Sequence, residues 1–182
     1  MNKNKGYSRT SITKDDVCLI SFPRTGSNYL RSLLNDSLSY DILNSHSLGY
    51  AQSKRIITLV REPYHTIKSL KTMTLHFYPD KNIDNLTNSY VDFFEQMYNN
   101  AEVVIKYETL VSTPEHVIDY LSKYLKIYNY ETFSSDLTGD SIPDGGLATS
   151  KSSPLYDSID MSKEDFTEAN KIYKKMIDRA SI

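Results

Sequence analysis

The chain has 182 residues, of which 39% are hydrophobic and 12% aromatic, and this size suits one globular domain with one core. Its formal net charge of -2 argues against an extended nucleic-acid surface, so any anion site must be local. No apolar run is long enough to span a bilayer, and the start of the chain lacks the apolar segment of a secretion signal. We therefore expect a polar tail at 1–14, one domain at 15–182, and a cytoplasmic location.

Short apolar runs rich in β-branched residues alternate with helix-like segments along the chain. The runs at 17–22, 55–60 and 102–107 have the length and composition of buried strands, and a weaker run lies at 39–43. The helix-like segments between them carry apolar residues on one face, at Leu30, Leu33, Leu34 and Leu38, at Ile67, Leu70, Met73 and Phe77, and at Leu86, Tyr90, Phe93, Phe94 and Met97. This alternation predicts an α/β fold in a single three-layer domain, with a parallel sheet of about four to five strands.

Capping residues mark two later helices, and a long loop lies between them. In "STPEHVIDYLSKYL" we expect Ser112 as the N-cap, with Glu115 completing a capping box and Pro114 in the first turn. Ser162 is expected to cap the last helix. Residues 134–154 are rich in glycine, serine and proline, which predicts a long loop of the kind that often forms a functional lid.

The stretch "FPRTGSN" joins the first predicted strand to the first predicted helix. Gly26 allows the backbone to curl around a ligand, and the free amides at the helix start favour an anion. The Walker A pattern is incomplete, because its first glycine and its lysine are missing. Two interpretations stay open at this point, a plain strand-to-helix turn and an anion cradle.

A second stretch, "REPYHTIKS", begins where the strand at 55–60 ends. Arg61 lies at the strand end, Pro63 starts a helix, and Ser69 follows about two helical turns later. An arginine at this edge of a parallel sheet suits a phosphate group. The alternative is a surface ion pair of Arg61 with Glu62 or Glu108.

Together these stretches resemble the PAPS-dependent sulfotransferases. "PRTGSNYL" at 23–30 is similar to the family's 5′-phosphosulfate loop, P-K-S-G-T-T-W-L, and "REPYHTIKS" at 61–69 to its 3′-phosphate motif, R-x-P-x-x-x-x-x-S. "VVIKYETLVSTPEHVIDYLSKYL" resembles the family's later strand, turn and helix. The resemblance implies a P-loop-like nucleotide site and an enzyme that transfers a sulfuryl group from PAPS to a hydroxyl or amine, releasing PAP.

The resemblance also implies a role for each matching residue. Arg24 takes the place of the family's lysine, a departure that keeps the charge and adds a planar fork for two oxygens. Tyr29 takes the tryptophan position beside the adenine, and Arg61 and Ser69 bind the 3′-phosphate. The 5′-phosphate is held through amides and side chains by Thr25, Gly26, Ser27 and Asn28.

The acceptor hydroxyl needs a base, for which His46 fits the family's position by order along the chain. The alternatives are that His46 is an exposed turn residue without a role and that Glu108 is the base. Lys151, in "LATSKSSPLY", is the candidate to close over the nucleotide, and the alternative for it is an ordinary loop.

No metal is implied, because the histidines share no ligand spacing and a sulfuryl group in transfer carries less charge than a phosphoryl group. Two other functions stay open: a non-catalytic nucleotide-binding or scaffold protein of the same fold, and a kinase-like phosphotransferase, against which the missing Walker lysine counts. The acceptor (a sugar, peptide, lipid headgroup or small molecule) and the oligomeric state are not specified by the sequence.

Overall fold

The computed structural model describes residues 17–47, 49, 55–74, 82–127, 154–162 and 166–182. The strands are β1 (Val17–Ile20), β2 (Leu43–Ser45), β3 (Arg55–Val60) and β4 (Val103–Lys106). The helices are α1 (Ser27–Leu38), α2 (Pro63–Thr74), α3 (Ile83–Asn100), α4 (Tyr107–Ser112), α5 (Pro114–Leu125), α6 (Pro154–Ser158) and α7 (Thr167–Asp178). The predicted tail at 1–14 and nearly all of the predicted loop at 134–154 lie outside the described residues.

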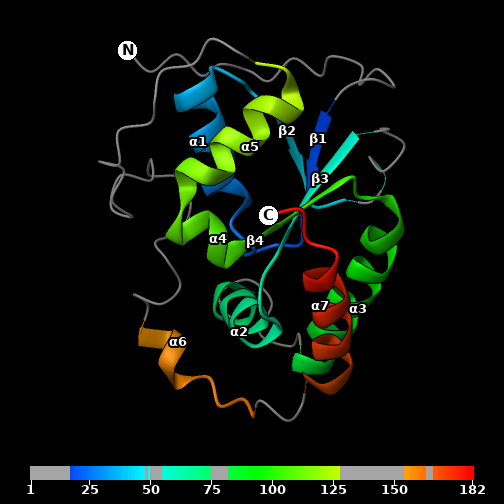
Figure 1. Ribbon diagram of the computed structural model, residues 1–182. Helices are drawn as coiled ribbons and strands as arrows, with labels where there is room; N and C mark the ends of the chain where they lie inside the picture. Colours follow the sequence, from blue (N-terminus) through cyan, green and yellow to red (C-terminus); the bar gives the residue numbers. More distant parts are fainter. Residues whose placement is uncertain (1–16, 48, 50–54, 75–81, 128–153, 163–165) are drawn as a thin grey trace.

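The four strands form one parallel sheet in the order β2-β1-β3-β4 (Figure 1). This confirms the predicted α/β class and parallel sheet. The helix after β1 packs on one face of the sheet and the helix after β3 on the other (Figure 1). The loops that follow these neighbouring strands therefore diverge at the carboxyl edge of the sheet, the place where open α/β sheets bind ligands.

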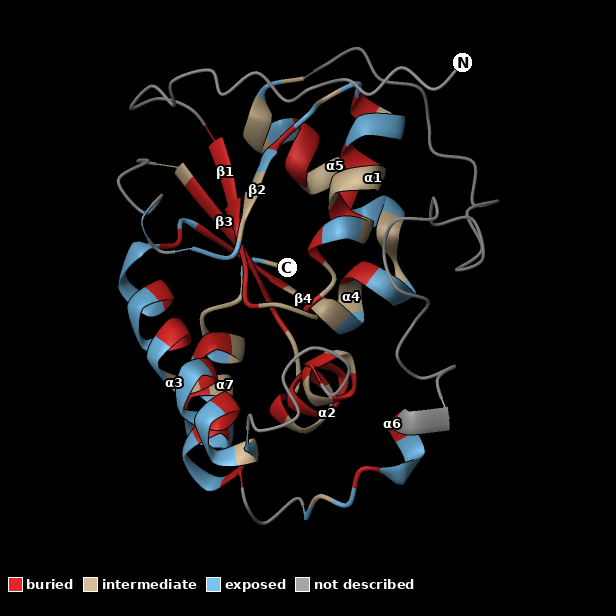
Figure 2. Cartoon of the chain, turned by 180° about the vertical axis from the view of Figure 1, so that it is seen from behind, coloured by how far each residue is buried: buried red, intermediate tan, exposed pale blue. Residues whose placement is uncertain are grey.

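Helices cover both faces because the strand side chains alternate between two cores. Cys18 and Ile20 of β1 pack toward α2, α3 and α7, whereas Val17 and Leu19 pack toward α1 and α5. All four are buried, and β1, β3 and β4 form the largely buried centre in Figure 2, whereas the edge strand β2 is partly exposed. Burial on both faces explains why the strands read as continuous apolar runs in the sequence.

The predicted helical faces are buried as expected. The four leucines of α1 and the five apolar residues of α3 that define these faces all lie in the core. In α2, Ile67 and Leu70 are buried and Met73 packs against the same core, while Phe77 lies outside the described residues.

Five predicted elements have other boundaries in the structure. The strands predicted at 17–22 and 102–107 are shorter, at Val17–Ile20 and Val103–Lys106, and three further differences change an element's start or cap. The strand predicted at 39–43 is β2, Leu43–Ser45, whose pairing with β1 begins at Leu43, one residue after the buried Ile42. Ser112 does not cap α5: it is the last residue of α4, and Thr113 occupies the N-cap without a side-chain cap. The last helix has Phe166, not Ser162, at its N-cap, and the Phe166 side chain is buried in the core.

The last two residues of the chain lie along the outer edge of β4. The Lys106 amide donates to the Ile182 carbonyl at 2.9 Å, and the Ile182 amide donates to the Val104 carbonyl at 3.4 Å. These bonds follow the pattern of a parallel pair, so the chain end covers backbone groups that an edge strand would otherwise expose.

Candidate functional site

Strand register brings the predicted site residues to one edge of the sheet. Ile20 pairs with Ser45, so the next residues, Ser21 and His46, lie side by side where β1 and β2 end. Val60 pairs with Lys106, so Arg61 follows β3 beside Tyr107, which follows β4. The carboxyl ends of the strands thus lie at one edge of the sheet, where the sequence analysis expected Arg61.

The loop after β1 is held in a strained, glycine-dependent shape. Gly26 has a φ of 100°, and a Cβ at this position would lie 2.9 Å from Cδ2 of Tyr107. Arg24 also has a left-handed φ, of 70°, which is uncommon for a residue with a side chain. Within the loop the Thr25 hydroxyl donates to the Phe22 carbonyl at 2.7 Å. Gly26 is therefore required both by its dihedral angle and by the close approach of the Tyr107 ring.

Arg24, Arg61 and Ser69 form one network of direct contacts. Nε of Arg24 donates to the Ser69 hydroxyl at 2.9 Å, from the loop after β1 to the middle of α2. Nη1 of Arg61 donates to the backbone carbonyl of Arg24 at 3.0 Å. The side chain of Arg61 thus supports the left-handed backbone of Arg24 while Ser69 fixes the guanidinium, so the two predicted phosphate motifs are in contact.

Two tyrosines that the sequence analysis did not assign to the site hold Arg61 in place. The buried Tyr90 hydroxyl donates to the Arg61 carbonyl at 2.7 Å, and the Arg61 guanidinium lies 4.1 Å from the centroid of the Tyr107 ring. Tyr107 is the last residue of the strand predicted at 102–107, so a parallel pairing of the strands at 55–60 and 102–107 would have predicted this neighbour. Tyr90 gave no such signal, because its helical spacing indicates only a core residue.

The guanidinium groups of Arg24 and Arg61 carry like charges and lie close to each other. Burial and, after it, the charge of Arg61 lower the pKa of Arg24, and Tyr107 opposes this shift. Arginine still stays protonated at neutral pH. Among the described residues neither arginine has an ion pair with a carboxylate, and Glu62 instead lies 3.3 Å from Nε2 of His65. The predicted alternative, an ion pair of Arg61 with Glu62 or Glu108, does not form within that part of the chain.

The start of α1 presents backbone amides to the same region. The amide of Leu30 bonds to the Gly26 carbonyl, while the preceding amides of the first turn have no acceptor within the helix. Ser27 is buried, and Asn28 is exposed and accepts from Asn44 at 3.4 Å. Tyr29 packs against the core that contains α1 and α5. The Thr25 hydroxyl already donates to Phe22, so its side chain cannot at the same time donate to an anion.

His46 is exposed, and one nitrogen of its ring has a partner. Nδ1 lies 2.7 Å from the Ser21 carbonyl, which only accepts hydrogen bonds, so Nδ1 carries the proton in the neutral ring. Nε2 is then left with a lone pair that can accept a proton. Glu108, the second base candidate, is exposed in the first turn of α4. Lys151 lies outside the described residues.

A second hydrogen-bonded group, absent from the sequence analysis, joins α2 to α6. Nδ1 of His65 lies 3.0 Å from the Tyr156 hydroxyl, and its Nε2 faces Glu62. The ammonium of Lys68, a residue that is 9% exposed, lies 4.9 Å from the centroid of the Tyr156 ring. These contacts fasten α6 to α2, and nothing in the spacing of the residues indicated them.

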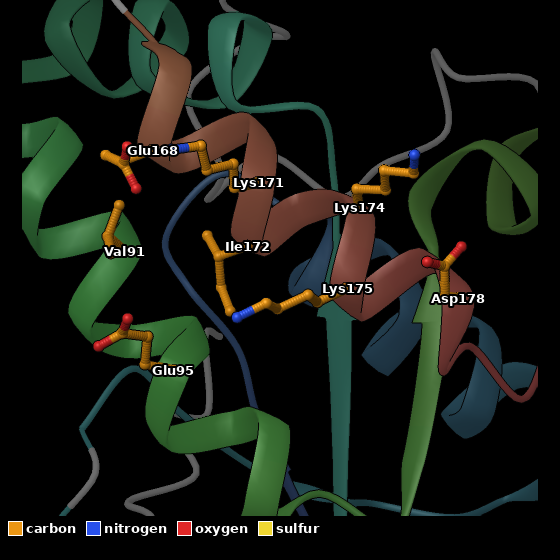
Figure 3. Close-up of a pocket in the computed structure, with 8 residues that line it drawn as sticks. All are labelled: Val91, Glu95, Glu168, Lys171, Ile172, Lys174, Lys175 and Asp178. Carbon is orange, nitrogen blue, oxygen red and sulfur yellow. Dashed lines mark hydrogen bonds and ion pairs between the residues drawn. The ribbon is translucent and has the colours of Figure 1, made fainter.

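A surface groove of about 310 Å³ lies between α3 and α7 and contains none of the predicted site residues (Figure 3). Its charged side chains include Lys171, which pairs with Glu168 at 2.6 Å. Within the described ranges no three His, Cys, Asp or Glu side chains gather as a metal ion would require. Of the helices in those ranges, none is both long and apolar enough to cross a membrane.

Comparison with known proteins adds no relative: no protein-family model matches the chain, and no curated protein is significantly similar to it.

Proposed function

We propose that this protein is a PAPS-dependent sulfotransferase whose nucleotide site is the carboxyl edge of the sheet. The observation that carries the proposal is the pair Arg24 and Arg61, which lie on neighbouring loops and have neutral groups as their described partners. Two cations placed side by side repel each other, and an anion bound between them relieves that repulsion. A donor with phosphate groups at both ends of its ribose supplies such charges.

The two arginines offer one cation for each phosphate position of PAPS. We assign the 3′-phosphate to Arg61, which follows β3 and has its guanidinium over the Tyr107 ring. Arg24 and the amides at the start of α1 serve the 5′-phosphosulfate in a P-loop-like manner. PAPS supplies the activated sulfuryl group and a phosphate leaving group, and Arg24 stabilises the charge that builds on that leaving group.

His46 serves as the base for the acceptor hydroxyl. Its Nδ1–H donates to the Ser21 carbonyl, which fixes the ring and keeps the lone pair on Nε2. Nε2 takes the proton of the acceptor hydroxyl as its oxygen bonds to sulfur, and the imidazolium that forms keeps the same bond to Ser21. The acceptor itself is a sugar, peptide, lipid headgroup or small molecule.

Nucleotide binding tests this proposal without knowledge of the acceptor. PAP should stabilise the protein against heat far more than AMP does, because only PAP carries the 3′-phosphate. At PAP about 100-fold above its Kd we expect a rise in Tm of roughly 5 to 10 °C, measured by differential scanning fluorimetry with AMP, ADP and ATP in parallel.

Equal shifts with PAP and AMP would remove the 3′-phosphate site and with it the sulfotransferase proposal. A larger shift with ATP would favour the kinase-like alternative. PAP binding without any transfer of labelled sulfate would favour a nucleotide-binding scaffold.

A further inference from the structure

The contact between Arg24 and Ser69 leaves a defined part of the guanidinium for a ligand. Arginine has five N–H donors in a rigid fork, one of them on Nε. Nε of Arg24 is already bonded to the Ser69 hydroxyl at 2.9 Å. The donors that remain are those on the two Nη atoms, which can hold two oxygens of one anionic group end-on.

Ser69 itself is poorly placed to touch a ligand. The residue is 1% exposed, on the buried side of α2, whereas Arg24 is half-buried at the sheet edge. A ligand that enters from the sheet edge in this conformation therefore meets Arg24 before it meets the Ser69 hydroxyl. The resemblance to sulfotransferases implied instead that Ser69 binds the 3′-phosphate directly.

We infer that Ser69 is a positioning residue, which acts on the nucleotide by orienting the guanidinium of Arg24 toward the 5′-phosphosulfate. The inference rests on the proposed function for the identity of the ligand. The backbone contact from Arg61 to the Arg24 carbonyl completes the arrangement, because it holds the residue from which this side chain extends. Arg24 is thus fixed at both its backbone and its Nε.

This arrangement also explains why an arginine is useful where the resembling family has lysine. A lysine has one ammonium at its end and no separate donor partway along its side chain. All three donors of a lysine radiate from that one nitrogen, so Ser69 and the anion would share it, whereas arginine contacts Ser69 through Nε and leaves both Nη atoms for the anion. Arg24→Lys should therefore weaken nucleotide binding although it restores the lysine typical of the resembling family.

The experiment measures two ligands in a mutant cycle by isothermal titration calorimetry. The ligands are PAP and adenosine 5′-phosphosulfate, which lacks the 3′-phosphate. Ser69→Ala should lower the affinity for both ligands by a similar factor, about 3- to 10-fold. It should lower neither affinity further in a protein that already carries Arg24→Ala. Ser69→Thr, which keeps the hydroxyl, should restore most of the affinity.

The matched control is Ser122→Ala. Ser122 is also 1% exposed and lies in α5, where its hydroxyl donates to the Asp119 carbonyl at 2.8 Å. This variant should bind both ligands as the unmodified protein does. If Ser69→Ala weakens PAP alone, Ser69 is a direct 3′-phosphate ligand and the inference is wrong. Additive losses for Ser69→Ala and Arg24→Ala overturn it as well.

A second measurement separates this inference from the proposed function, because it needs no ligand. The Nε–H signal of Arg24 in a ¹⁵N-correlated NMR spectrum is identified as the one that disappears in Arg24→Lys. It should exchange slowly with water in the unmodified protein and in Ser122→Ala, and rapidly in Ser69→Ala. If neither nucleotide binds, the proposed function fails, and this signal still decides whether Ser69 holds Arg24; equal exchange in all three proteins refutes the positioning role.

Discussion

The two ends of β3 carry arginines with nearly the same local contacts. Arg55, at the first position of the strand, donates to the Tyr124 carbonyl at 2.7 Å and lies 4.4 Å from the centroid of the Tyr124 ring. Arg61, just after the last position, donates to the Arg24 carbonyl at 3.0 Å and lies 4.1 Å from the centroid of the Tyr107 ring. Each arginine thus contacts a backbone carbonyl and the face of a tyrosine ring.

The ends differ in the charges around them. At the amino end the Tyr124 hydroxyl donates to the Glu102 carboxylate at 2.6 Å, so a negative charge lies on the same tyrosine as Arg55. At the carboxyl end another cation, Arg24, lies close to Arg61. An arginine stacked on a tyrosine is therefore a structural feature at one end and a candidate anion ligand at the other, and the neighbouring charge makes the difference.

The largest effect is expected for the chemistry at the carboxyl end. His46→Ala should slow sulfuryl transfer by roughly 10²- to 10⁴-fold while PAP affinity stays within about twofold, because the imidazole contacts only the acceptor proton. The measurement is single-turnover transfer of ³⁵S from labelled PAPS into a mixed pool of acceptors, with PAP affinity measured on the same preparations.

Glu108→Gln is the comparison variant for the base. Glu108 is exposed in the first turn of α4, so the substitution should leave the fold intact. Full activity in His46→Ala, together with an inactive Glu108→Gln that still binds PAP, would move the base to Glu108. Loss of PAP binding in His46→Ala would assign the histidine to the nucleotide instead.

The next largest effect separates the two arginines directly. Arg61→Ala should weaken PAP by about 1.5 to 3 kcal/mol, the range for a hydrogen bond to a charged group, and leave AMP nearly unchanged. Arg55→Ala removes a similar stacking contact from the other end of the same strand. It should cost about 1 kcal/mol of stability and change the affinity for neither nucleotide.

Calorimetric titration of both nucleotides and urea unfolding of both variants make this comparison. If Arg61→Ala unfolds the protein, or if Arg61→Ala and Arg55→Ala lower the affinity for PAP equally, Arg61 is structural. The two ends of β3 then do not differ in function. As a control, PAP should still raise the Tm of Arg55→Ala, which would show that a substitution at the other end of β3 leaves the nucleotide site intact.

The sequence predicted the place of the candidate residues in the fold better than it predicted the contacts that hold them. Arg61 and the loop around Gly26 follow apolar runs that only buried strands explain, so their place at the sheet edge could be inferred. The contacts of Arg61 with Tyr90 and Tyr107 could not, because they depend on the packing of α3 and on the pairing of β3 with β4. Strand register is a property of the assembled sheet, and the spacing of residues along one strand does not reveal it.

Local signals also failed where tertiary packing decided the outcome. The Ser112 capping box is a good local pattern, but α4 begins directly after β4 and ends at Ser112. Ser112 is therefore helical and cannot be the N-cap of α5. The contact between Arg24 and Ser69 spans 45 positions, and no local pattern reports it. The pair Arg55 and Tyr124 spans 69 positions, so no local pattern indicated that Arg55 has contacts similar to those of Arg61.

The smallest effect is expected at the amino end of β3, in Tyr124→Phe. The hydroxyl contact with Glu102 is exposed, so its loss should cost only about 0.5 kcal/mol at neutral pH, with unchanged PAP affinity. Burial and, after it, the hydrogen bond to Glu102 raise the pKa of Tyr124 to about 12, against an opposing effect of Arg55. The folded protein therefore keeps the phenol proton at a pH where the unfolded chain, with a pKa near 10, releases it.

The stabilisation that comes from the raised pKa of Tyr124 is complete below about pH 10 and is lost as the pH rises toward 12. Urea unfolding at pH 9, 10 and 11 should show a shallower loss of stability in Tyr124→Phe than in the unmodified protein. Some loss remains, because burial and, after it, the charges of Glu108 and Glu62 also raise the pKa of Tyr173 to about 12. If Tyr124→Phe instead weakened PAP as much as Arg61→Ala does, the amino end of β3 would belong to the nucleotide site, and the balance of charge would not be what distinguishes the two arginines.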